Sequence, residues 1–271
     1  MDWIQAVVLA VIQGLTEFLP VSSSAHLILP SQLLGWQDQG LAFDVAIHLG
    51  TLIAVLWYYR NTLGAMVGGA LRGVSQRQMN PDLHLGLMIV WATIPAVIFG
   101  FLFKDMVEQY ARSAAVIGTT TILFGGLLWW ADRRGSKQLQ LAAVGLGIAT
   151  LVGLAQALAL IPGTSRSGIT LTAALLLGLR RDDAAHFSFL LSIPVILGAI
   201  VLMSRDLVHL EQVYSNAQLA MACLVSALVA YASIGFFLRL VTRVGMVPFA
   251  IYRLVLGSVL LLMVLWPVTQ L

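Results

Sequence analysis

Long apolar runs recur from one end of the chain to the other, separated by short polar segments. An all-α protein with six membrane-spanning helices is predicted, in one integral membrane domain that covers residues 1–271, because each run has the roughly 20 apolar residues that cross a bilayer. Only 10% of the residues are charged, whereas soluble domains carry about 25%. The predicted spans are 41–59, 84–103, 114–131, 187–204, 219–238 and 249–267.

Two further apolar segments are interrupted by polar residues. The first, residues 3–34, is broken at Pro20, and the second, residues 139–179, is broken at Pro162-Gly163. Proline ends a helix, and a serine that follows it can cap the next one. We expect two re-entrant helical hairpins, because irregular backbone at membrane depth must be sheltered by protein or face a cavity.

The broken segments begin two similar halves, residues 1–132 and 133–271. The stretch Pro20-Val-Ser-Ser-Ser resembles Pro162-Gly-Thr-Ser-Arg-Ser, and each half continues with three predicted spans. An odd number of spans turns the second half upside down, as in transporters built from inverted repeats. An inverted repeat of a hairpin plus three spans is therefore expected, with the two hairpin tips meeting near the midplane.

Basic residues are divided unevenly between the two sets of loops. Because lysine and arginine favour the cytoplasmic side, we expect both termini on the outer side. The basic residues lie in short loops between spans, so the net charge of +3 does not indicate a nucleic-acid partner. One set of loops holds Arg60, Arg72, Arg77, Arg133, Arg134, Lys137, Arg180, Arg181, Arg239 and Arg243, and the other holds Lys104, Arg112 and Arg205.

The first broken segment carries a carboxylate inside an apolar stretch. Gln13 and Glu17 are four residues apart, so they share one face of the first helix. A carboxylate at this position can hold a divalent cation against a phosphate, or orient a histidine. Glu17 is thus a candidate metal ligand.

Three serines and a histidine follow the break. His26 comes four residues after Ser22 and three after Ser23, so on a helix it can lie beside either hydroxyl. Ser24 is only two residues away and is expected to face elsewhere. Three roles stay open for His26: base for a serine nucleophile, nucleophile itself, or acid for the leaving group.

The second broken segment combines hydroxyl groups with an arginine. A helix that starts after the break points its N-terminal N–H groups at the other hairpin and favours an anion. The guanidinium of Arg166 suits phosphate oxygens, and an arginine at membrane depth is usually functional. The alternative is that the serines only cap helices while Arg166 and Glu17 form a structural ion pair. Arg253, just inside the last span, is expected either to reach the surface or to support the site.

These stretches resemble the undecaprenyl pyrophosphate phosphatase family of the BacA type. Its (E/Q)xxxE motif matches Gln13 to Glu17, followed by F-L-P-V-S-S and His26. Its PGxSRSxxT motif matches residues 162–170 at every fixed position, and P-F-A-I-Y-R at 248–253 also looks like a family segment. The resemblance covers essentially the whole chain.

The resemblance implies a multi-pass enzyme of the bacterial plasma membrane that converts the C55 lipid diphosphate to the monophosphate and inorganic phosphate. It also implies bacitracin resistance, a requirement for Mg²⁺ or Ca²⁺, and a site open to the periplasm or outer face. Gln13 replaces a glutamate common in the family, which removes one carboxylate from a metal site. Carried over by position, the catalytic residues are Glu17, Ser23, His26 and Arg166, and the substrate-binding residues are Gln13, Ser22, Gly163, Thr164, Ser165, Ser167 and Thr170.

Two other classes of membrane protein compete with this interpretation. A lipid flippase or a transporter for an anionic substrate would use inverted repeats and midplane breaks equally well. The type-2 phosphatidic acid phosphatases are disfavoured, because the stretch after Ser165-Arg166 lacks the histidine and aspartate of their signature. The expected partners are the polyprenyl diphosphate and membrane lipid, and the sequence leaves a homodimer open.

Overall fold

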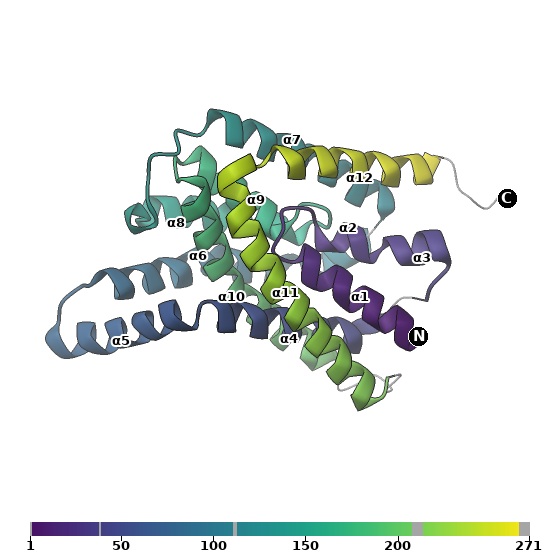
Figure 1. The fold of residues 1–271 in the computed structure, drawn as a ribbon, viewed down its shortest axis with the longest axis horizontal. Helices are drawn as coiled ribbons and strands as arrows, with labels where there is room; N and C mark the ends of the chain where they lie inside the picture. Colours follow the sequence, from purple (N-terminus) through teal and green to yellow (C-terminus); the bar gives the residue numbers. More distant parts are fainter. Residues whose placement is uncertain (1, 38, 111–112, 208–213, 266–271) are drawn as a thin grey trace.

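The computed structural model describes residues 2–37, 39–110, 113–207 and 214–265, and the regular structure in these ranges is helical apart from one isolated bridge (Figure 1). Short 3₁₀ turns at Leu141–Ala143 and Leu158–Leu160 flank α8. The α-helices are α1 (Trp3–Thr16), α2 (Ser23–Leu27), α3 (Leu29–Leu34), α4 (Gly40–Tyr58), α5 (Arg60–Gln76), α6 (Pro81–Tyr110), α7 (Ala114–Arg134), α8 (Leu146–Ala157), α9 (Arg166–Leu176), α10 (Arg181–Leu207), α11 (Asn216–Val244) and α12 (Val247–Leu265).

Six helices of the described ranges are long and apolar enough to cross a membrane: α4, α6, α7, α10, α11 and α12. Each corresponds to one predicted span, so the prediction of six spans is confirmed and the protein is a multi-pass membrane protein. In contrast, α1 has 14 residues and is about 21 Å long, less than the roughly 30 Å hydrocarbon core. The short helices on either side of Pro20 and Pro162 agree with two broken hairpins, whose re-entrant placement stays a prediction.

The loop predicted between the first two spans is a helix. Residues 60–76 form α5, which packs against α6. Asn80 joins the two helices, because its side-chain amide donates to Gly69 O at 2.7 Å and its Oδ1 accepts from Leu83 N at 3.0 Å. The loop prediction was wrong because the stability of α5 comes from this contact with α6, which the polar composition of the segment does not reveal.

Helices of the two halves pack against each other reciprocally. α1 of the first half packs on α11 of the second, and α8 of the second half packs on α6 of the first. Small residues permit both crossings: a Cβ on Gly14 would lie 2.8 Å from Ser226 O, and one on Gly153 would lie 2.4 Å from Ala92 O. This reciprocity is what an inverted repeat would produce, and the inversion itself stays a prediction.

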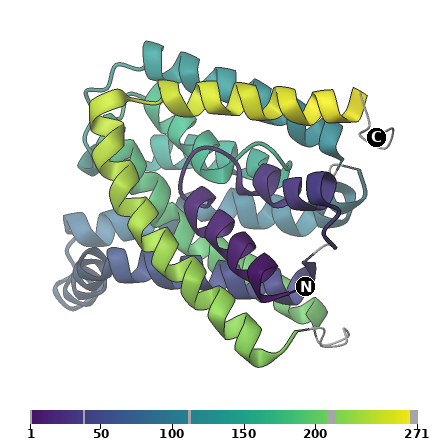
Figure 2. The same ribbon diagram turned by 45° about the vertical axis from the view of Figure 1, so that its right-hand side comes forward.

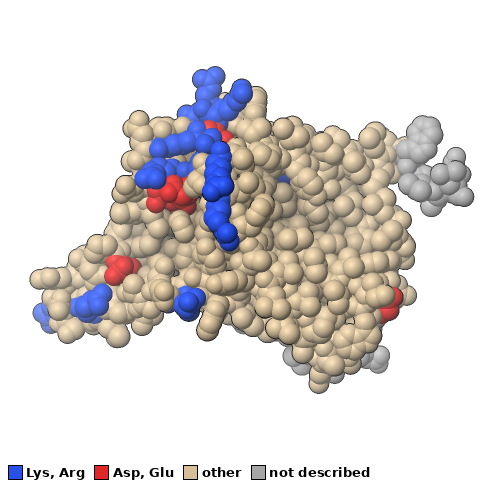
Figure 3. Space-filling view, in the orientation of Figure 1, with Lys and Arg blue, Asp and Glu red and all other residues tan. Residues whose placement is uncertain are grey.

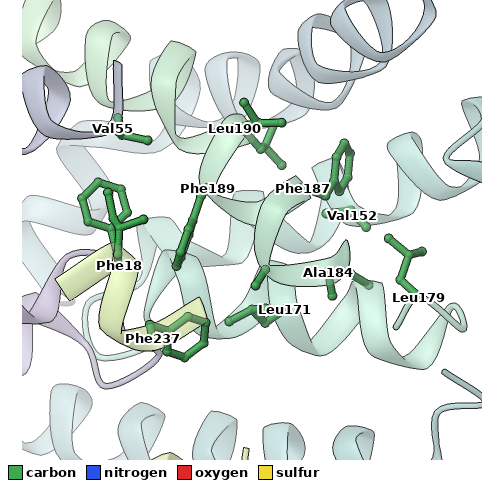
Figure 4. Packing of buried hydrophobic residues seen from close by; sticks show 14 of the residues in the cluster. Phe18, Val55, Val152, Leu171, Leu179, Ala184, Phe187, Phe189, Leu190 and Phe237 are labelled. Carbon is green, nitrogen blue, oxygen red and sulfur yellow. The ribbon is translucent and has the colours of Figure 1, made fainter. Parts of the chain in front are cut away.

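An aromatic cluster lies at the centre of the hydrophobic core (Figure 4). Phe189 contacts Phe18 edge-on, with ring centroids 5.4 Å apart, and also contacts Phe237 at 5.5 Å. Phe18 is the neighbour of Glu17 in the chain, and the Arg166 guanidinium lies 5.9 Å from the Phe18 ring. The core therefore supports the two charged residues that the sequence singled out.

The basic side chains of the face shown in Figure 3 gather at the end of the molecule away from the two termini. This agrees with the uneven division of lysine and arginine among the loops. Of the three basic residues expected at the other end, Arg112 and the side chains of Lys104 and Arg205 lie outside the described part of the structure. The direction in which this end faces in the cell stays a prediction.

Candidate active site

The two broken segments meet in the middle of the helix bundle. Figures 1 and 2 show the loop between α1 and α2 beside the start of α9. We call the segment between α1 and α2 the first tip and the turn before α9 the second tip, each with the start of the helix that follows it. Two hydrogen bonds join the tips: Gly163 N donates to Ser24 Oγ at 3.1 Å, and Ser167 Oγ donates to Leu19 O at 2.9 Å. The expectation that the tips come together is confirmed.

A serine with unusual backbone geometry precedes the second helix of each broken segment. Ser22, before α2, has φ 74° and ψ 98°, and Ser165, before α9, has φ 68° and ψ 113°. Positive φ is rare for residues with a side chain, and such strain costs about 1–3 kcal/mol per residue. Strain of this kind persists only where the surrounding structure holds the backbone, so both turns are held in place by their neighbours.

The turn before α9 also requires a glycine. Gly163 has φ +88°, and a Cβ there would lie 2.2 Å from Thr120 Oγ1. Two threonines of α7 hold this turn: Thr120 Oγ1 donates to Pro162 O at 2.6 Å and Thr121 Oγ1 donates to Gly163 O at 3.2 Å. The carbonyl groups of the turn are thus bonded on the α7 side, and this fixes the direction in which α9 begins.

Glu17 and Arg166 form an ion pair across the two halves. Arg166 donates to Glu17 Oε1 at 3.1 Å and to Ser188 O at 3.1 Å, and the side chains are only 12% and 9% exposed. Gln13 Nε2 donates to the other carboxylate oxygen at 2.9 Å, which confirms that Gln13 and Glu17 share one helix face. The guanidinium is therefore held in a fixed plane at the start of α9.

Ser23 lies beside Glu17. Its hydroxyl is 3.5 Å from Glu17 Oε2, a long contact that a small movement would tighten. The Glu17 carboxylate is therefore placed to accept the proton of Ser23. No hydrogen bond between Ser23 and His26 is found among the described residues.

His26 uses both ring nitrogens in other contacts. Nδ1 lies 2.7 Å from Ser22 O and Nε2 lies 2.6 Å from the hydroxyl of Tyr252 on α12. Helical spacing predicts a serine hydroxyl beside this ring, but the backbone carbonyl of Ser22 occupies that position, since residue i−4 of a helix presents its carbonyl there. Ser24 faces away from His26, as its spacing predicts: its Oγ lies 3.1 Å from Ser22 Oγ and accepts from Gly163 N of the second tip.

Several predicted phosphate-binding hydroxyls are used within the protein. Ser165 Oγ accepts from Gly168 N at 3.1 Å and caps α9, and Ser167 Oγ donates to the first tip. Thr170 contacts Ser188 Oγ at 2.7 Å and ties α9 to α10. By contrast, Thr164 Oγ1 is buried and has no hydrogen-bond partner among the described residues. Of these hydroxyls, that of Thr164 can still form a hydrogen bond with a ligand.

Arg253 is fully buried behind the second tip. Its NH2 donates to Gly163 O at 2.9 Å and to Thr164 O at 2.8 Å, and its Nε donates to Thr121 O at 3.2 Å. The alternative that Arg253 reaches the surface is therefore wrong, and its supporting role is confirmed. Its NH1 has no partner among the described residues, so one donor of a buried cation remains free.

The first tip offers few ligands for the divalent cation that the resemblance implies. Among the described residues no group of three or more histidine, cysteine, aspartate or glutamate side chains could hold a metal ion. However, Gln13 Oε1 is buried without a hydrogen-bond partner among the described residues, while Nε2 of the same amide donates to the Glu17 carboxylate. Mg²⁺ is commonly held by one or two carboxylates plus substrate phosphates and water, so Glu17 would supply the carboxylate and Gln13 Oε1 a neutral oxygen.

The spanning helices enclose two strained turns, a helix N-terminus, the fully buried Arg253 and the nearly buried Arg166. These features define a class of protein. It is a multi-pass membrane protein whose interior site suits a phosphate-bearing ligand. The family model for bacitracin resistance protein BacA matches residues 6–259, and the chain belongs to this family. The chain is also 64% identical, over 261 residues, to an undecaprenyl-diphosphatase of Alcanivorax borkumensis, with 96% of this chain and 98% of that protein covered.

The family match includes both tips and the Tyr252-Arg253 pair. Sequence reasoning alone missed the contacts of Ser24, Ser188 and Tyr252. The only signal for Tyr252 was the segment P-F-A-I-Y-R at 248–253, which resembles a family segment without indicating what the tyrosine contacts.

Proposed function

We propose that this protein hydrolyses undecaprenyl diphosphate to undecaprenyl phosphate and inorganic phosphate. In the overall reaction, the oxygen of a water molecule becomes bonded to the terminal phosphorus, and the bond from that phosphorus to the bridging oxygen breaks. Family membership and the 64% identical undecaprenyl-diphosphatase support this substrate. The structural observation that carries the proposal is the ion pair between Glu17 and Arg166, at 3.1 Å, where the two strained tips meet.

Arg166 and the start of α9 bind the diphosphate in this proposal. The first N–H groups of a helix have no partner within it and point at a ligand. Arg166 is held by Glu17 and Ser188, so its remaining donors are oriented before substrate arrives. Donors that are fixed in a site of low polarity stabilise the charge that develops on the phosphoryl group.

The attack on phosphorus can begin with Ser23, with His26 or with a water molecule. Ser23 lies beside the Glu17 carboxylate, which would take its proton, and His26 can attack phosphorus itself or act on a water. Acid quenching during turnover, followed by mass spectrometry, separates these routes. Phosphate on Ser23, phosphate on His26, and no phosphoenzyme each identify a different attacking group.

The cation proposed for the site is Mg²⁺ or Ca²⁺, held by Glu17 and Gln13 Oε1 together with the substrate. When bound, it neutralises phosphate charge and so lets two phosphates enter a buried site. The protein's own contribution is to keep Gln13 Nε2 on Glu17 at 2.9 Å, which leaves the amide oxygen free for a ligand.

We further propose that the protein acts in the bacterial plasma membrane with its site open to the outer face. There it would return the lipid carrier of cell-wall synthesis to the monophosphate form, and this activity would account for bacitracin resistance. The supporting observation is the concentration of basic residues at the end opposite the termini (Figure 3).

Transport of an anionic lipid is the second candidate function, because the reciprocal packing of α1 and α8 also suits a transporter. Phosphate release by the purified protein in detergent separates the two, since a micelle has no second compartment. We expect release that depends on Mg²⁺ or Ca²⁺ and is lost in Glu17→Gln, while Arg243→Gln, an exposed control, retains it. Binding of the lipid diphosphate without phosphate release would favour transport.

A further inference from the structure

The hydrogen-bond partners of His26 decide which ring nitrogen carries the proton. Ser22 O can only accept, so the Nδ1 atom that lies 2.7 Å away must be the donor. In the neutral ring, Nε2 is then an acceptor. Its partner at 2.6 Å is the hydroxyl of Tyr252, which must donate. The one basic nitrogen of His26 is therefore covered by a phenol hydroxyl.

The two rings also lie side by side in nearly parallel planes. The imidazole and phenol rings are parallel within 2°, with centroids 5.5 Å apart. Ala25 of α2, the neighbour of His26 in the chain, packs in a small apolar cluster with Leu256 and Leu260 of α12. The hydroxyl of Tyr252 thus meets His26 in a geometry that the two helices set.

Tyr252 and Arg253 are consecutive residues with different surroundings. The Tyr252 side chain is 46% exposed, whereas Arg253 is fully buried against the carbonyl groups of the second tip. One turn of α12 therefore contacts both tips: Tyr252 holds α2 of the first, and Arg253 holds the turn before α9. The contact between His26 and Tyr252 therefore lies closer to the protein surface than the contacts of Arg253.

We propose that Tyr252 is a positioning residue for His26. Its hydroxyl holds Nε2 of the Nδ1-protonated ring in one direction and occupies that nitrogen until an oxygen of the substrate or of water replaces it. This inference rests on the proposed function, because it assigns His26 a part in the attack on the diphosphate. It adds a residue from the last helix to a site otherwise built from the two tips.

The test is Tyr252→Phe, which removes the hydroxyl and keeps the aromatic ring beside His26. We expect kcat for phosphate release to fall about 10-fold while KM changes less than about threefold, the pattern of lost orientation of a general acid–base group. In the substrate-free protein, the ¹⁵N resonance of the unprotonated His26 Nε2 should move when its donor is removed. Its absence from the spectrum of His26→Gln assigns that resonance.

The matched control is Tyr231→Phe. Tyr231 is 41% exposed, close to the 46% of Tyr252, and its ring contacts Tyr58 rather than the site. The control should leave kcat and the His26 resonance unchanged. An unmoved resonance in Tyr252→Phe, or unchanged kcat, would overturn the positioning role, even if the variant were less stable. A wild-type protein that releases no phosphate would instead overturn the proposed function, and the resonance would still report whether the contact exists.

Discussion

The carboxylate of Glu17 and the guanidinium of Arg166 lie 3.1 Å apart although 149 positions separate them in the chain. Each comes from a helix end that cannot cross the membrane on its own, and each is nearly buried. Breaking a buried pair by removing one partner typically costs 3–5 kcal/mol, because the remaining charge is left uncompensated. The pair therefore joins the two halves and also places a cation at the start of α9.

Arg166→Lys should lower kcat/KM for diphosphate hydrolysis about 100-fold or more, the size of losing a fixed donor to developing charge. The lysine keeps the charge, but an ammonium group cannot donate to Glu17 and Ser188 O and still face two phosphate oxygens in one plane. Steady-state phosphate release measures the effect, with exposed Arg243→Lys as the control. Near-normal turnover in Arg166→Lys would show that the site needs charge alone.

Ser24→Ala should destabilise the protein by about 1–3 kcal/mol, the cost of leaving a part-buried N–H without its acceptor. The spacing of Ser24 from His26 predicts a mild effect on activity, but its Oγ accepts from Gly163 N across the two tips. Thermal unfolding in detergent measures the change. Exposed Ser75→Ala on α5 is the control, and equal unfolding temperatures in both variants would mean that the tips do not depend on this bond.

The spans, the two breaks and the meeting of Glu17 with Arg166 could be predicted from the sequence. The hydrophobic effect and backbone hydrogen bonding act along the chain, so apolar length and proline positions reveal the helices. Because charge at membrane depth needs a partner, a lone carboxylate and a lone arginine in two such breaks are expected to pair.

The partners of His26 and the helix α5 could not be predicted in this way. Helical spacing shows which residues share a face, but the acceptor beside His26 is the Ser22 carbonyl rather than a hydroxyl, and its other partner comes from 226 positions away. α5 likewise depends on its contact with α6. Both features are set by tertiary packing between distant segments, and the local sequence pattern does not predict such contacts.

Gly163→Ala should abolish most activity. A Cβ at this position would lie 2.2 Å from Thr120 Oγ1 and 2.4 Å from Ile117 O, and φ is +88°, so the turn before α9 must shift. Gly126→Ala on α7 is a matched control, because a Cβ there meets nothing within 4 Å and alanine favours a helix by about 1 kcal/mol. The comparison needs phosphate release and thermal unfolding of both variants. Wild-type kcat in Gly163→Ala would show that α9 need not start at a fixed position.

Gln13→Glu should lower the Mg²⁺ or Ca²⁺ concentration that gives half-maximal activity. The substitution adds a second carboxylate beside Glu17, at the position where the amide oxygen of Gln13 has no partner in the described part of the chain, and hard cations prefer anionic oxygen ligands. Gln156→Glu is the control, since Gln156 is an equally buried glutamine of α8 without a described partner. A metal titration of both variants decides the matter, and an unchanged midpoint in Gln13→Glu would place the cation elsewhere.

The active site should be served from the outer face of the membrane. The basic residues gather at the end away from the termini (Figure 3), and positive charge is retained in the cytoplasm. The diphosphate would enter at the first tip while the polyprenyl tail stays in the bilayer. Sealed right-side-out vesicles that receive substrate and metal only from outside should then release phosphate into the medium, and a chelator added outside should stop it. Inverted vesicles under the same conditions should be inactive until they are permeabilised. Activity that requires metal on the cytoplasmic side would reverse the orientation, and the lipid would then be dephosphorylated on the inner face.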